Sequence, residues 1–110
     1  MTLDDLIAFG ANVDEGLSRC MNNETFYLRL VESLKGEKGF ESLQTAIAAG
    51  DLDAAFEAAH ALKGVLGNLS ITPLYEPVAE ITELLRVKQG ADYPALVDAI
   101  MLKWNEFLAL

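Results

Sequence analysis

The stretch LDAAFEAAHALKGVLGNL, residues 52–69, contains the only histidine of the 110-residue chain. Its apolar side chains recur at intervals of three and four residues, which predicts one helix with a single buried stripe. At about 100° per residue, His60 lies roughly 120° from the centre of that stripe, so we expect it at the edge of the core or outside it. The predicted stripe consists of Leu52, Ala55, Phe56, Ala59, Leu62, Leu66 and Leu69.

Three further residues share the solvent side of this helix with the histidine. They are Lys63, Gly64 and Gly67, and together with His60 we name them the histidine strip. A glycine inside a helix costs about 1 kcal/mol relative to alanine. Glycine is kept where another backbone or molecule approaches closely, and no helix of the same bundle is expected on this side. The strip therefore indicates a cleared surface on which a partner can dock around the imidazole.

The rest of the sequence repeats the helical spacing, and no stretch alternates β-branched and polar residues as a strand would. The sequence therefore predicts an all-α fold. The expected apolar faces are Leu3, Leu6 and Ile7; Val13, Leu17, Cys20 and Met21; Tyr27, Leu30, Val31 and Leu34; Phe40, Leu43 and Ile47; Leu74, Val78, Ile81 and Leu85; and Tyr93, Val97, Ile100, Trp104 and Phe107.

Residues that cap or interrupt helices predict the boundaries. Asn23, Asp51 and Asp92 are well placed as N-caps, while KGEKG at 35–39 and Gly50 end the helices that precede them. Pro94 falls in a first turn, where proline is tolerated.

A second proline, Pro77, removes one helical hydrogen bond, so we expect an irregular first turn in a helix that begins at Thr72. Because the connections are short, neighbouring helices should run antiparallel. We expect one domain over residues 1–110, an antiparallel up-and-down four-helix bundle with additional short N-terminal helices packed across it or extending one end.

The composition excludes several classes of function. With 17 acidic and 8 basic side chains the net charge is −9, which disfavours binding to nucleic acid. A single cysteine, Cys20, excludes an internal disulfide and a cysteine-rich metal site. The N-terminus MTLDDLIAFG carries acids where a secretory signal carries bases, and no apolar run approaches the ~20 residues that cross a bilayer. We expect a cytoplasmic protein that does not enter a membrane.

One exposed histidine supports a narrow range of chemistry. Neutral imidazole has a nucleophilic nitrogen that can accept a phosphoryl group, and Lys63 could meet the resulting charge. A zinc site needs about four ligands, usually His and Cys, and the chain has one of each. No strand-elbow serine suggests a hydrolase, and no glycine-rich phosphate loop suggests self-phosphorylation with ATP.

The segment AAHALKG, residues 58–64, resembles the histidine-containing phosphotransfer (HPt) domains of multistep phosphorelays. The likeness depends on His60, Leu62, Lys63 and Gly64, followed by Gly67 where the family commonly has a small residue. NVDEGLSRCMNNETFYLRLVESL, residues 12–34, is similar to the family's N-terminal segment, and AIAAGDLDAAFEAAH, residues 46–60, is similar to its approach to the phosphorylated helix.

This resemblance implies that His60 carries the phosphoryl group, that Lys63 helps to hold it, and that Gly64 and Gly67 leave room for an incoming receiver domain. The phospho-aspartate and the Mg²⁺ ion belong to the receiver, so this chain itself needs no cofactor, no metal and no kinase activity. The implied partners are response-regulator receiver domains and a hybrid sensor histidine kinase.

Two positions depart from the family's pattern. Ser70 stands where many members have a glycine, and Thr82 stands where several have a glutamine that hydrogen-bonds near the imidazole. Thr82 is therefore the expected contact near His60, although a threonine reaches less far. Asn68, beside Gly67, is a candidate for contacting the partner or else a solvated surface amide.

Two other functions remain open from the sequence. The first is a non-catalytic helical adaptor that docks on receiver or kinase domains without being phosphorylated. The second is a stand-alone equivalent of a kinase's own histidine domain, phosphorylated from ATP by a separate catalytic domain.

Overall fold

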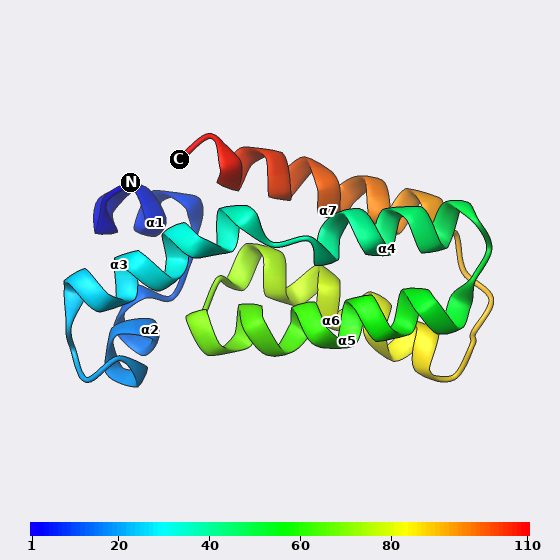
Figure 1. Cartoon of the computed structure of the whole chain (residues 1–110), viewed down its shortest axis with the longest axis horizontal. Coiled ribbons are helices and arrows are strands. Elements are labelled where there is room, and N and C mark those ends of the chain that lie inside the picture. Colours follow the sequence, from blue (N-terminus) through cyan, green and yellow to red (C-terminus); the bar gives the residue numbers. More distant parts are fainter.

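The computed structural model describes residues 1–110 and consists of helices joined by short connections (Figure 1). The prediction of an all-α fold is confirmed. In chain order the elements are α1 (Leu3–Phe9), α2 (Val13–Arg19), α3 (Glu24–Ser33), the short 3-10 turn η1 (Leu34–Gly36), α4 (Gly39–Ala48), α5 (Leu52–Leu69), α6 (Thr72–Arg86) and α7 (Tyr93–Leu108).

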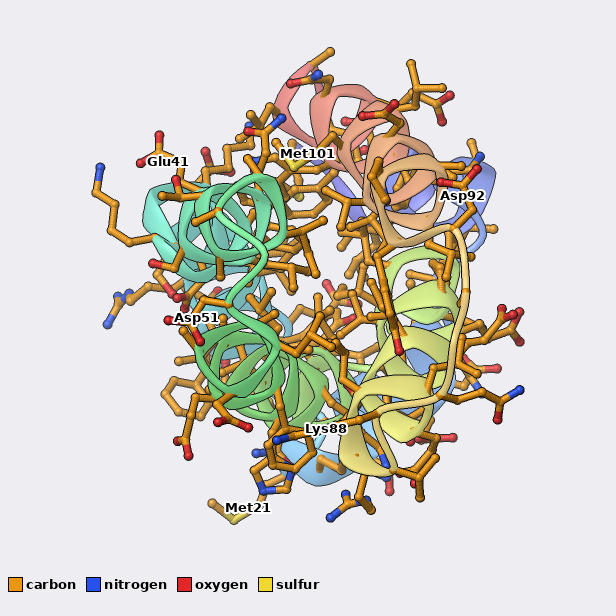
Figure 2. The ribbon with its side chains drawn as sticks, turned by 90° about the vertical axis from the view of Figure 1, so that its right-hand side faces the viewer. Met21, Glu41, Asp51, Lys88, Asp92 and Met101 are labelled. Atoms are coloured by element: carbon orange, nitrogen blue, oxygen red, sulfur yellow. The ribbon has the colours of Figure 1, made fainter.

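The last four helices form the predicted antiparallel up-and-down bundle. Helix α5 packs against α4 and α6, and α7 closes the ring by packing against the same two helices. Figure 2, viewed along the bundle, shows the four helices at four corners, with α4 beside Glu41 and α6 leading to Lys88. The buried side chains form one connected core, in which the Phe40 and Trp104 rings stack with their centroids 4.0 Å apart.

The three N-terminal helices extend one end of the bundle, close to the C-terminus of α7 (Figure 1). Tyr27 of α3 is fully buried, and its hydroxyl donates to the Leu69 carbonyl at 2.8 Å. That carbonyl lies in the last turn of α5, where no backbone partner within the helix is available. A Cβ added to Gly16 would come within 2.6 Å of the Tyr27 ring, so α2 can lie this close only with glycine at that position.

The predicted helix boundaries are confirmed at their caps. The side chains of Asn23, Asp51 and Asp92 accept hydrogen bonds from the backbone N–H groups three residues later, at 3.0, 3.0 and 3.2 Å. Gly50 adopts a φ of +71°, a left-handed conformation that closes α4 without steric cost. The KGEKG segment also ends α3 as expected, through the turn η1.

Three local expectations are wrong. Met21 is 89% exposed and has a φ of +54°, because α2 has already ended at Arg19 and the chain turns there. In Figure 2 Met21 points into solvent beyond α5. Ile7 is mostly exposed because the short helix α1 buries Leu6 instead. Helix α6 runs without interruption through Pro77, which lacks only the N–H that would bond to the carbonyl four residues earlier, near the helix start.

No helix of this chain combines the length and the apolar character required to cross a membrane.

The bond between Tyr27 and Leu69 gives a first prediction. Burial raises the pKa of the Tyr27 hydroxyl from 10.0 to about 12, with a further contribution from Cys20. The folded state therefore favours the protonated phenol, so this group's contribution to stability is complete below pH 10 and is lost as the pH rises towards 12.

We expect Tyr27→Phe to lower the free energy of unfolding by about 1–2 kcal/mol at neutral pH, because a buried carbonyl loses its partner. Urea denaturation measures this loss, and the same measurement above pH 10 should show a shallower alkaline decline than in the wild type. Tyr75→Phe is the matched control, since no protein group accepts a hydrogen bond from that hydroxyl. Equal stability of the two variants would contradict the assignment.

Candidate functional site

His60 lies near the middle of α5 and is exposed to solvent, as the helical pattern predicted. No hydrogen bond joins its imidazole to any other group of the chain. Its ring instead stacks on that of Phe56, one turn earlier on α5, with centroids 5.5 Å apart and planes inclined by 16°. Both ring nitrogens are therefore left without a partner from this chain.

Lys63 follows His60 by three residues and therefore shares its side of the helix. Its ammonium pairs with the Glu83 carboxylate of α6 at 3.3 Å. Hydrogen bonds from Arg86 and then from Lys63 hold the pKa of the Glu83 carboxyl below its ordinary value, so Glu83 is ionised at neutral pH. Because an ion pair this exposed is weak, a more highly charged anion near His60 can compete for the lysine.

The two glycines of the histidine strip have different surroundings. A Cβ added to Gly64 would meet nothing within 4 Å, which agrees with the cleared surface predicted there. Gly67 is less open, because side chains from α2 and α6 reach it. Its carbonyl accepts a hydrogen bond from Arg19 of α2 at 2.8 Å, and an added Cβ would lie 3.4 Å from the Tyr75 ring of α6.

An open groove of about 700 Å³ runs along the histidine strip towards the N-terminal helices. Side chains from three helices line it, and nearly all of them are polar. Arg19 and Lys63 supply positive charge, while Glu15 and Glu76 supply negative charge. The exposed Asn68 also lines this groove, which places it where a docked partner could reach it.

Ser70 ends α5 in a left-handed conformation with a φ of +58°. Glycine adopts this conformation without strain, whereas a residue with a Cβ, such as serine, is less favoured there. In this chain the Ser70 hydroxyl donates to the Glu15 carboxylate at 3.0 Å, and Glu15 pairs with Arg19 at 3.0 Å. The departure from the pattern thus adds a link between α5 and α2.

The expectation for Thr82 is wrong. Thr82 is fully buried, and its hydroxyl donates to the Val78 carbonyl of its own helix at 2.6 Å. It can therefore reach neither a docked partner nor the imidazole. The adjacent residue Glu83 faces α5 instead and contacts Lys63.

Three residues near the site were not predicted as part of it. Phe56 was assigned to the buried stripe, but it is only partly buried and lies against His60. Glu83 and Arg86 of α6 pair with each other at 3.1 Å, and the Arg86 guanidinium lies 5.0 Å from the centre of the Phe56 ring. The position of Phe56, one turn before His60, is a sequence feature from which its contact with the imidazole could be predicted. The contacts of Glu83 and Arg86 depend on how α6 is rotated relative to α5, which the sequence pattern does not specify.

Potential metal ligands do not gather at this site or elsewhere in the chain: no three His, Cys, Asp or Glu side chains come together as a candidate centre.

The fold and the site together define a helical module that presents one accessible histidine beside a lysine and an open groove. The sequence model described as the Hpt domain matches residues 28–109, from α3 to the end of α7. The chain belongs to the Hpt domain family, which the likeness of residues 58–64 had suggested. Members of this family act in histidine phosphotransfer in phosphorelays and interact with receiver domains of two-component systems.

The matched range begins inside α3, so residues 12–27 of the predicted N-terminal likeness lie outside it. Comparisons with curated proteins and with solved structures gave no match.

The left-handed end of α5 yields a second prediction. We expect Ser70→Gly to be more stable than Ser70→Ala by about 1 kcal/mol, because alanine is strained in this conformation and both variants lose the bond to Glu15. Thermal or urea unfolding of the two variants measures the difference. The control pair is Ser18→Gly and Ser18→Ala, at an exposed site within α2, where the order should be reversed. The same order at both positions would contradict this account.

Proposed function

We propose that the chain is a phosphoryl carrier in which His60 accepts a phosphoryl group from the phospho-aspartate of one receiver domain and passes it to the aspartate of another. The observation that carries this proposal is that the imidazole is exposed and makes no hydrogen bond within the chain. His60 is the only histidine, it is exposed, and no group of the chain occupies either ring nitrogen. Gly64 beside it leaves space for a bulky donor.

The transfer follows from the chemistry of neutral imidazole. The lone pair of one ring nitrogen attacks phosphorus, a P–N bond forms, and the P–O bond to the aspartate breaks with release of its carboxylate. The second ring nitrogen retains its proton, so the ring carries positive charge until that proton is lost. The reverse sequence delivers the phosphoryl group to the next receiver. The Mg²⁺ ion that supports transfer belongs to the receiver.

Lys63 is the residue we assign to holding the phosphoryl group. In the unmodified chain its ammonium forms an ion pair with the Glu83 carboxylate. A phosphoryl group on His60 introduces close to two negative charges and three acceptor oxygens, so it competes with the single charge of Glu83. Lys63 then exchanges one carboxylate partner for the phosphoryl oxygens through a charge-assisted bond.

We infer the remaining partners from the family to which the chain belongs. The chain has no glycine-rich phosphate loop of its own, so we assign it no kinase activity. The phosphoryl group would originate in a hybrid sensor histidine kinase and reach His60 through a receiver domain. Gly64, Gly67 and Asn68 supply part of the docking surface.

The central experiment is transfer from a phosphorylated receiver domain to the purified chain. We expect an acid-labile phosphate on the wild type and none on His60→Gln, because no other histidine is present. Circular dichroism should show that the variant keeps its helices, since His60 lies on the exposed face. Receiver binding without any phosphohistidine would favour the adaptor function instead, and full labelling of His60→Gln would exclude His60 as the acceptor.

The role of Gly64 is tested by adding bulk to the helix surface. Both Gly64→Ala and Gly64→Leu should stabilise α5, by about 1 kcal/mol for alanine. Only leucine projects far enough to obstruct a docked domain, so we expect it to slow transfer from the receiver by roughly tenfold or more.

Phosphoramidate, a small donor that needs no docking surface, should label the Gly64→Leu variant at the wild-type rate. Unchanged transfer from the receiver to that variant would contradict docking over Gly64.

A further inference from the structure

Phosphoryl transfer to His60 is faster when the imidazole plane is held in one orientation, because a freely rotating side chain reaches a reactive orientation only part of the time. Thr82, the expected contact, is buried in α6 and bonded to Val78. No hydrogen bond fixes the ring either. The nearly parallel stack on Phe56 is the one aromatic contact that the imidazole makes.

Phe56 is itself held from two sides of the structure. It is partly buried and packs against the hydrophobic core, which restricts its rotation. The guanidinium of Arg86, on the neighbouring helix, lies 5.0 Å from the centre of its ring, within range of a cation–π interaction. Arg86 is fixed in turn by Glu83, through Nε to Oε2 at 3.1 Å and Nη2 to Oε1 at 3.4 Å.

These contacts connect the histidine to α6 without any hydrogen bond to its ring. Glu83 also accepts a hydrogen bond from Lys63. The same carboxylate therefore contacts both Arg86, which lies over Phe56, and the lysine of the histidine strip. His60, Phe56, Arg86, Glu83 and Lys63 therefore form one continuous cluster across α5 and α6, which we name the stacking cluster. Its geometry matters because a stack touches the face of the imidazole and leaves the nitrogens at the ring edge free.

We propose that Phe56 is a positioning residue for His60, that it orients the imidazole by stacking, and that Arg86 holds Phe56 in place for this purpose. The role in transfer rests on the proposed function of His60. Stacking fixes the ring plane while leaving both nitrogens available, one to attack phosphorus and one for water or the docked receiver. A hydrogen bond from the chain, by contrast, would occupy one of them.

The stacking itself can be tested by NMR in the absence of any partner. Because the chain has one histidine, its two imidazole C–H protons can be identified directly. We expect the ring current of Phe56 to displace both signals from the positions of an unstructured histidine. Phe56→Leu should return them to those positions, while Phe56→Tyr should preserve the displacement. Signals that do not change in Phe56→Leu would overturn the proposal.

The effect on chemistry is tested by the rate of transfer from a phosphorylated receiver at saturating concentration, expressed per folded molecule. We expect Phe56→Leu to slow this rate by about threefold to tenfold, as the loss of an aromatic pair implies, with little change in the receiver concentration at half-maximal rate. Phe56→Tyr should recover the wild-type rate. A wild-type rate in Phe56→Leu would overturn the proposal, since packing alone would then explain the ring.

Arg86→Gln should slow transfer in the same direction by a smaller factor. Arg29→Gln on α3 is the matched control, because it removes the same charge from an exposed arginine that forms no ion pair. Equal rates in these two variants would remove Arg86 from the proposal. The proposed function is judged separately on the wild type: a chain that accepts no phosphoryl group contradicts the function of His60 before any Phe56 variant is compared.

Discussion

Burial of one side of α5 is the constraint on which the rest of the structure depends. Ala55 and Ala59 are fully buried, and these small side chains allow neighbouring helices to pack close to the α5 backbone. Leu62 and Leu66 continue the same face into the centre of the core. Because one side of α5 is committed to this packing, its other side is held at a fixed orientation towards solvent, and His60 is held there with it.

Much of this arrangement could be predicted from the sequence because it depends on local rules. Helical spacing and short polar caps are properties of neighbouring residues, so the bundle helices and the exposure of His60 followed from them. The turn at Met21 could not be predicted in the same way. Two successive residues there, Met21 and Asn22, adopt positive φ without being glycine, and a spacing pattern carries no information about that conformation.

The details of the site were less predictable because they depend on how two helices are rotated against each other. Counting from relatives pointed to Thr82, but the phase of α6 turns Thr82 into the core and Glu83 towards Lys63. The error is one residue, which is about 100° on a helix. Phe56 was hard to place for a related reason, because it lies at the edge of the apolar stripe. One side of its ring packs against the core and the other is at the surface, and the spacing pattern predicts only the first.

The link between Ser70, Glu15 and Arg19 has a consequence for how the groove beside His60 can change. These side chains make α2 one wall of the groove, although α2 lies outside the matched range of residues 28–109. The two charged side chains that α2 places in the groove, Glu15 and Arg19, are the same ones that join it to Ser70 and to the Gly67 carbonyl. A substitution at either position would therefore alter the lining of the groove and the attachment of α2 to α5 together.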